Sequence, residues 1–284
     1  MHKTFILLTI FVSTALALSA KEELKPSTTS VYKTVGDSDL KLHIFNPEGH
    51  QSSDQRPAII FFFGGGWNGG TPKQFYPHCQ HLAERGIVAM AAEYRTKSSH
   101  GTSPIECLKD GKSALRWVRS NANKLGINSS NLIAGGGSAG GHIASSVANC
   151  HKINDAQDDL LISTNVRALV LFNPVFDNSP EGYGHKRVKA YWRDFSPMHN
   201  LSSTYSPPTI IFLGTEDHLI PVATAKKYQS MMEQLKVPCE LHLYPGQKHG
   251  FFNAHNPEYY TKTVASMDAF LESLGLLEAQ KTQK

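Results

Sequence analysis

The sequence carries little charge for its length, and no part of it concentrates charge of one sign. Asp, Glu, Lys and Arg make up 18% of the 284 residues, and the formal net charge is only +4. The basic residues are scattered, without a basic block or a stripe in which basic and aromatic residues alternate. Nucleic-acid-binding proteins usually show such a cluster, so we expect no nucleic-acid partner.

Cysteine is also scarce, and its spacing excludes the common metal-binding patterns. The four cysteines are Cys79, Cys107, Cys150 and Cys239, without a C-x-x-C pair or a zinc-ligand spacing. In an oxidising compartment they could form disulfides, and all four can be paired in three ways. Buried free thiols fit the sequence equally well. The sequence therefore predicts no metal site and leaves the state of the cysteines open.

Long apolar runs are missing except at the N-terminus. There, His2 and Lys3 precede an apolar stretch from Phe5 to Leu18, which is followed by small residues. This is the layout of a signal peptide, and the run is short for a membrane span. No cysteine stands at the expected cleavage point. We therefore expect residues 1–20 to be a signal peptide without a lipid anchor, and the mature chain to be secreted or periplasmic.

The rest of the chain alternates short apolar runs with stretches of helical spacing. We expect strands at residues 31–35, 40–45, 58–63, 87–92, 132–134, 166–172, 208–213 and 240–244, and helices at 104–125, 224–235, 259–274 and from residue 139 onward. Alternation of this kind is typical of a mainly parallel sheet covered on both faces by helices. The sequence therefore predicts one α/β domain over residues 21–284, with a central sheet of about eight strands.

The most informative local pattern is Gly136-Gly137-Ser138-Ala139-Gly140. It fits G-x-S-x-G and lies where an apolar strand gives way to a helix. At such a strand-to-helix turn, small neighbours allow a strained serine to project its hydroxyl above the sheet. The helix N-terminus then points free N–H groups at any anion that forms there. Ser138 is therefore the candidate nucleophile.

An acid and a histidine follow this serine in the order that a Ser-Asp-His triad on this kind of scaffold requires. Asp217 lies in the loop just past the apolar run 208–213, in Gly214-Thr215-Glu216-Asp217, and His249 comes after the alternating run 240–244. We prefer Asp217 to its neighbour Glu216 because the spacing of this turn resembles the acid turn of such enzymes. His142, which follows the serine motif on the helix, is interpreted as a packing residue.

A glycine-rich loop supplies candidate oxyanion donors. The apolar run 58–63 ends in Gly64-Gly65-Gly66-Trp67. Glycines let the backbone turn its N–H groups toward a substrate at close range. We expect the N–H groups of Gly65, Gly66 and Ala139 to form the oxyanion hole.

Together these segments resemble the serine α/β-hydrolases of the esterase/lipase group, close to small secreted carboxylesterases with a G-G-G-W loop. Matching segments run from about Pro57 to Phe252. Two positions depart from the pattern: Phe63 replaces the histidine that normally braces the loop, and Glu93 stands where aspartate is commoner. The resemblance implies acyl transfer by Ser138, Asp217 and His249 without a metal or organic cofactor.

The resemblance also implies a cap over the site at about residues 174–205, a segment rich in Pro, Gly, aromatic and charged residues. Tyr183, Tyr191, Trp192 and Phe195 could line the substrate pocket or form the core of the cap. Trp67, Tyr183 and Trp192 are the candidate substrate-binding residues, and we expect Trp67 and Trp192 to be exposed enough to stack on sugar rings.

Three functions are compatible with these residues. The first is a secreted carboxylesterase acting on short acyl groups, such as acetyl carried on carbohydrate; the carbohydrate part is implied by the resemblance to secreted esterases. The second is a serine peptidase of the same fold, although the chain has no room for the N-terminal propeller usual in such peptidases. The third is a non-catalytic binding protein, although such relatives usually lose the serine or histidine. The sequence does not indicate the oligomeric state.

Overall fold

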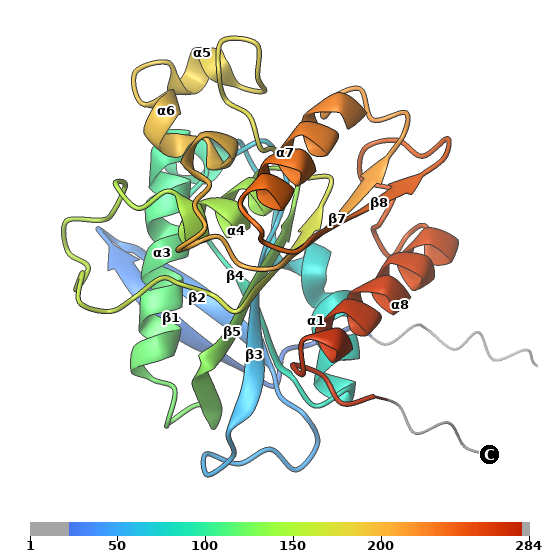
Figure 1. Cartoon of the computed structure of the whole chain (residues 1–284). Helices are drawn as coiled ribbons and strands as arrows, with labels where there is room; N and C mark the ends of the chain where they lie inside the picture. The colour runs from blue at the N-terminus through green and yellow to red at the C-terminus, as the bar shows by residue number, and fades with distance from the viewer. Residues whose placement is uncertain (1–22, 280–284) are drawn as a thin grey trace, which may run out of the picture.

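The computed structural model describes residues 23–279, and its centre is one twisted eight-stranded sheet (Figure 1). Its strands lie in the order β1-β2-β4-β3-β5-β6-β7-β8. Their bounds are β1 Thr28–Val35, β2 Ser38–Phe45, β3 Arg56–Phe62, β4 Val88–Ala92, β5 Ile127–Gly137, β6 Ala168–Phe172, β7 Thr209–Gly214 and β8 Cys239–Tyr244. The pairs β1–β2 and β2–β4 are antiparallel, and all other pairs are parallel. The predicted mainly parallel sheet is confirmed.

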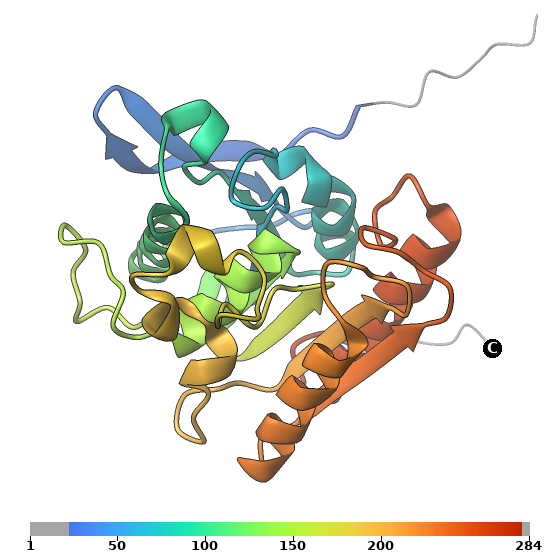
Figure 2. The same cartoon turned by 90° about the horizontal axis from the view of Figure 1, so that it is seen from above.

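Helices cover both faces of this sheet. The helices are α1 Tyr76–Glu84, α2 Lys97–His100, α3 Pro104–Ser120, α4 Ala139–Asn149, α5 His185–Val188, α6 Trp192–Phe195, α7 Val222–Gln234 and α8 Pro257–Ser273, with 3-10 turns η1 Pro72–Phe75 and η2 Pro197–Asn200. Helices α1 and α8 lie on one face, and α3, α4 and α7 lie on the other (Figures 1 and 2). The central strands β3 to β7 are therefore buried on both sides, which explains their nearly continuous apolar sequences.

The long predicted helix 104–125 is shorter than its sequence pattern indicated. It starts at Pro104 as expected but ends at Ser120. The side-chain amide of Asn121 donates to the carbonyl of Trp117, and the chain then turns through residues 121–126. A local side-chain hydrogen bond of this kind competes with helix propagation. The prediction was wrong because apolar spacing continued beyond the point where the backbone left the helix.

All four cysteines are free thiols, and Cys79, Cys107 and Cys150 are buried. Burial raises the pKa of the Cys150 thiol to about 12, and it has the same effect on Cys239. Of the two possibilities that the sequence left open, the structure has free thiols rather than disulfides, three of them buried and Cys239 partly buried. Such thiols are inert small apolar groups.

Residues 174–205, predicted as a cap, contain α5, α6 and η2 and lie above the carboxyl ends of the central strands (Figure 1). No helix among residues 23–279 is long and apolar enough to span a membrane. The predicted signal peptide, residues 1–20, lies outside the described residues.

Candidate active site

Ser138 occupies the sharp turn between β5 and α4. Its backbone adopts φ 55° and ψ −119°, a conformation that residues other than glycine rarely adopt. The turn fits only because its neighbours are small: a Cβ atom on Gly140 would lie 2.0 Å from the carbonyl oxygen of Phe62. The Ser138 N–H donates to the carbonyl of Phe172 at 2.9 Å, which ties the strained residue to β6. Strain held in place by surrounding structure is typical of functional positions.

The structure brings Ser138, His249 and Asp217 into one hydrogen-bonded chain. The Ser138 hydroxyl lies 2.8 Å from His249 Nε2, and His249 Nδ1 lies 2.7 Å from Asp217 Oδ2. The other carboxylate oxygen of Asp217 accepts the N–H groups of Leu219 and Ile220, each at 2.9 Å. The Asp217 side chain is fully buried. A carboxylate held by two backbone donors fixes the imidazole with Nε2 facing the hydroxyl, the geometry in which a histidine can deprotonate a serine.

The glycine loop after β3 lies against this serine. Gly65 and Gly66 have positive φ angles of 123° and 62°, and they line the same cavity as Ser138 and His249. Ala139 is buried as the first residue of α4. Within the described residues, none of these three N–H groups donates a hydrogen bond to another group. They are therefore free to bind an oxyanion.

Three side chains hold this loop although Phe63 replaces the bracing histidine. Phe63 stacks on Tyr94 with ring centroids 4.0 Å apart, and the Tyr94 hydroxyl donates to the Phe63 carbonyl at 2.6 Å. Gln74 accepts the N–H of Gly64 at 2.6 Å, and Arg187 donates to the carbonyl of Gly66. The loop is therefore held by Tyr94, Gln74 and Arg187, which the sequence did not single out.

The cavity at Ser138 has a volume of about 430 Å³, within the range of small-molecule sites. Of the three aromatic residues predicted to bind substrate, only Tyr183 lines it. Trp67 is 1% exposed and packs against His142, Tyr183 and Phe195, so it offers no open face to a sugar ring. Trp192 packs on His185 and His199 within the cap. The prediction that Trp67 is exposed was wrong because the cap folds over its ring.

His142 is a packing residue, as its position after the serine motif indicated. Its ring is fully buried, and its Nε2 lies 3.0 Å from the carbonyl of Phe195 and 3.1 Å from Asn178 Oδ1. Burial lowers the pKa of His142 to about 3, so the ring is neutral at physiological pH.

Four amide side chains that the sequence pattern did not single out line the cavity: Asn68, Gln74, Asn173 and Asn253. Asn173 directly follows β6, as Asp217 follows β7, and this position after a parallel strand was a usable signal. Asn68, Gln74 and Asn253 carry no comparable signal. No group of three or more His, Cys, Asp or Glu residues suited to a metal ion occurs within residues 23–279.

Comparison with known proteins places this geometry in a family. The BD-FAE family model matches residues 42–232. The probable carboxylic ester hydrolase LipM of Mycobacterium tuberculosis is 29% identical over 69% of this chain and 49% of its own length. The acetylxylan esterase of Xylanibacter ruminicola is 24% identical over 93% of this chain and 55% of its own length. The chain thus spans about half the length of these curated relatives.

The similar solved structures include Thermogutta terrifontis esterase 2. Its apo form superposes with a TM-score of 0.87 at 40% identity, covering 91% of this chain and 98% of that one. Structures of the same esterase with propionate and with butyrate bound superpose with TM-scores of 0.86. The sheet, the match over residues 42–232 and these superpositions show that the chain belongs to the BD-FAE family, within the esterase/lipase group of α/β-hydrolases.

Proposed function

We propose that the protein is a serine carboxylesterase with Ser138, His249 and Asp217 as its catalytic triad. The observation that carries this proposal is the pair of short contacts, 2.8 Å and 2.7 Å, that join the three side chains next to a loop with free N–H groups. A nucleophile, a base and an orienting acid within hydrogen-bond reach, beside oxyanion donors, fit acyl transfer.

The reaction has two steps. The Ser138 hydroxyl attacks the ester carbonyl while His249 Nε2 takes its proton, and Asp217 stabilises the imidazolium that forms. The N–H groups of Gly65, Gly66 and Ala139 hold the oxyanion. His249 then returns the proton to the leaving alcohol, which gives an acyl-enzyme, and water repeats the same path to release the acid. No step requires a metal or organic cofactor.

We propose that the preferred esters carry short acyl groups such as acetyl, in part on carbohydrate. The cavity of about 430 Å³ suits a small ester. The propionate- and butyrate-bound forms of Thermogutta terrifontis esterase 2 support short acyl groups, and the relative named acetylxylan esterase supports acetyl groups on a polysaccharide. Residues 1–20, as a signal peptide, would carry the enzyme to the periplasm or medium where such polymers occur.

The other two functions are less well supported. A peptidase would use the same triad, so the distinction lies in whether amides are cleaved. A binding protein would not need Ser138, His249 and Asp217 to be hydrogen-bonded in sequence. The two short contacts join them in that order.

The first experiment is hydrolysis of p-nitrophenyl esters from acetate to octanoate by the wild type and by Ser138→Ala. We expect acetate to be cleaved fastest and the variant to lose roughly 10⁴- to 10⁶-fold in kcat. A preference for long chains would exclude the acetyl proposal. A variant as active as the wild type would reject the triad. An inactive wild type would reject the esterase, and a matched panel of amides would then test the peptidase.

A further inference from the structure

A chain of side-chain amides that line the cavity joins the glycine loop to the histidine loop. At the glycine loop, the N–H of Gly64 donates to Gln74 Oε1 at 2.6 Å. Gln74 Nε2 then donates to Asn253 Oδ1 at 3.0 Å, and Asn253 Nδ2 donates to the carbonyl of Gly250 at 2.7 Å. Residues 179 positions apart in the sequence are thus joined beside Ser138.

The chain continues to the histidine. The N–H of Gly250 donates to Asn173 Oδ1 at 2.9 Å, and Asn173 Nδ2 lies 3.4 Å from His249 Nε2. Asn173 is fully buried at the end of β6 with φ 36°, so its side chain projects from a fixed backbone. The two loops that carry the oxyanion donors and the base therefore share one set of hydrogen bonds.

The direction of every amide in this chain is fixed by backbone groups whose polarity is known. The N–H of Gly64 can only donate, so Gln74 must present its oxygen to it and its NH₂ group to Asn253. The carbonyl of Gly250 can only accept, and the N–H of Gly250 can only donate, which fixes Asn253 and Asn173 in turn. A single arrangement satisfies all these bonds, and no flipped amide does.

We propose that Gln74, Asn253 and Asn173 are positioning residues that hold the oxyanion loop and His249 at a fixed separation across Ser138. This inference rests on the proposed esterase function. Gly65 and Gly66 have no side chains to pack and so depend on neighbours for their orientation. Oxyanion donors must lie about 2.7–3.1 Å from the developing oxyanion and be held there to within roughly 0.5 Å, and a loop anchored to the base loop meets that requirement.

The test uses Gln74→Met and Asn253→Leu, which keep side-chain size and remove the hydrogen bonds. With p-nitrophenyl acetate we expect kcat to fall roughly 10- to 100-fold in each variant, because small misplacements of catalytic groups cost about that much. KM should stay within about 3-fold, since the amides hold the machinery and not the acyl group. Gln229→Met is the matched control, because Gln229 is also half-buried and donates one hydrogen bond, to the carbonyl of Cys239.

The double variant distinguishes one connected chain from two independent contacts. If Gln74 and Asn253 act in one chain, breaking either link releases the loop, and the double variant should be within about 3-fold of the slower single variant. Losses that multiply would overturn the connected chain. If the amides only stabilise the fold, Gln74→Met, Asn253→Leu and Gln229→Met should all lower the unfolding temperature by similar amounts. In that case kcat should stay unchanged in all three variants.

The outcomes also separate this inference from the esterase proposal. An active wild type with unchanged kcat in Gln74→Met and Asn253→Leu overturns the positioning role and leaves the esterase intact. A wild type that cleaves no ester rejects the esterase and this inference with it. If the Met or Leu variant does not fold, Gln74→Ala and Asn253→Ala make the same comparison.

Discussion

At the scale of single residues, the surroundings of Asp217 distinguish it clearly from its neighbour in the sequence. Both of its carboxylate oxygens are used, one by His249 and the other by the N–H groups of Leu219 and Ile220. Glu216, directly before it, is exposed. Two acids with adjacent numbers thus occupy entirely different environments, which makes them a matched pair for testing the assignment.

We expect Asp217→Asn to lower kcat by about 10⁴-fold, because the amide can impose the wrong tautomer on His249 while preserving its position. Glu216→Gln removes a charge of the same sign from the neighbouring position and should leave kcat within about 2-fold of the wild type. Steady-state hydrolysis of p-nitrophenyl acetate by both variants is the measurement. Equal losses in the two variants would argue against Asp217 as the orienting acid.

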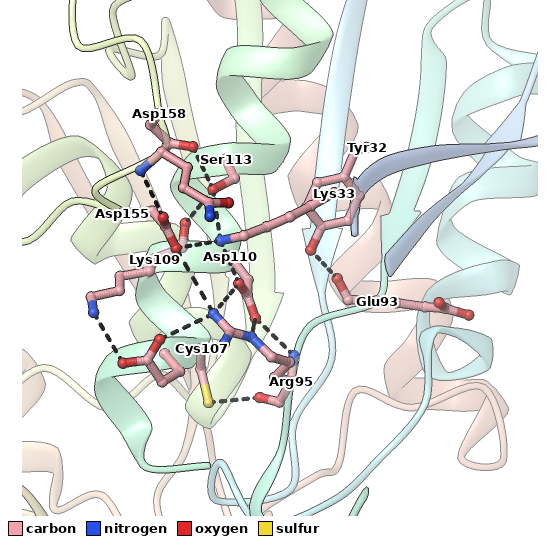
Figure 3. Close-up of polar contacts among 12 residues, drawn as sticks. Tyr32, Lys33, Glu93, Arg95, Cys107, Lys109, Asp110, Ser113, Asp155 and Asp158 are labelled. Atoms are coloured by element: carbon pink, nitrogen blue, oxygen red, sulfur yellow. Dashed lines mark hydrogen bonds and ion pairs between the residues drawn. The ribbon is translucent and has the colours of Figure 1, made fainter. Parts of the chain in front are cut away.

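At the scale of elements, a buried ion cluster holds the edge strand β1 to the rest of the molecule (Figure 3). Strand β1 pairs only with β2 in the sheet. Lys33 on β1 contacts Asp110 on α3 at 2.9 Å and Asp155 at 2.7 Å, while Arg95 contacts Asp110 with two nitrogens at 2.7 and 2.8 Å. The Asp110 side chain is fully buried, and its hydrogen bond raises the pKa of Arg95 above the ordinary value.

Asp110→Asn should therefore destabilise the protein by about 3–5 kcal/mol, because it leaves the Lys33 and Arg95 cations buried with less compensating charge. The control is Glu258→Gln, which breaks the exposed pair with Lys262 and should cost at most about 0.5 kcal/mol. Denaturant unfolding of both variants measures the difference. If both variants lost a similarly small free energy of unfolding, the charge of Asp110 would not be needed to compensate the buried cations.

At the scale of the whole molecule, two buried neutral histidines make stability depend on pH. His78 lies fully buried among Phe61, Phe75 and Phe172, and neither ring nitrogen has a hydrogen-bond partner within residues 23–279. Burial lowers the pKa of His78 to about 3, the same value as for His142. A histidine in the unfolded chain has a pKa of about 6.5. Between about pH 6.5 and 3 the unfolded chain therefore binds more protons than the folded protein does.

The stability from each ring is therefore complete above about pH 6.5 and is lost as the pH falls toward 3. At pH 5 the loss should be about 2 kcal/mol per histidine. We expect His78→Leu to leave the free energy of unfolding at pH 7 unchanged or to raise it, because the substitution removes unpaired buried nitrogens. Between pH 7 and 5, the variant should lose about 2 kcal/mol less of this free energy than the wild type does. Denaturant unfolding at both pH values measures this.

The control is His255→Leu, because His255 is exposed and shows what a surface histidine contributes. If His78→Leu depended on pH as strongly as the wild type, the prediction would be contradicted.

Local pattern alone determined much of this protein. The buried parallel strands were readable because strands covered on both faces need continuous apolar residues, and the serine turn was readable because its backbone admits only small neighbours at Gly136 and Gly140. The order Ser138, Asp217, His249 followed from the ends of those strands. Each of these features depends on residues close together in the sequence.

The tertiary structure decided what depends on residues far apart. It sets the 2.8 Å and 2.7 Å contacts among Ser138, His249 and Asp217, buries Trp67 under residues 174–205, leaves the cysteines unpaired, and joins Gln74 to Asn253 across 179 positions. None of these could be read from the chain, because loop conformations determine which side chains meet. Amides and aromatic rings have no fixed partners until the packed sheet brings those loops together.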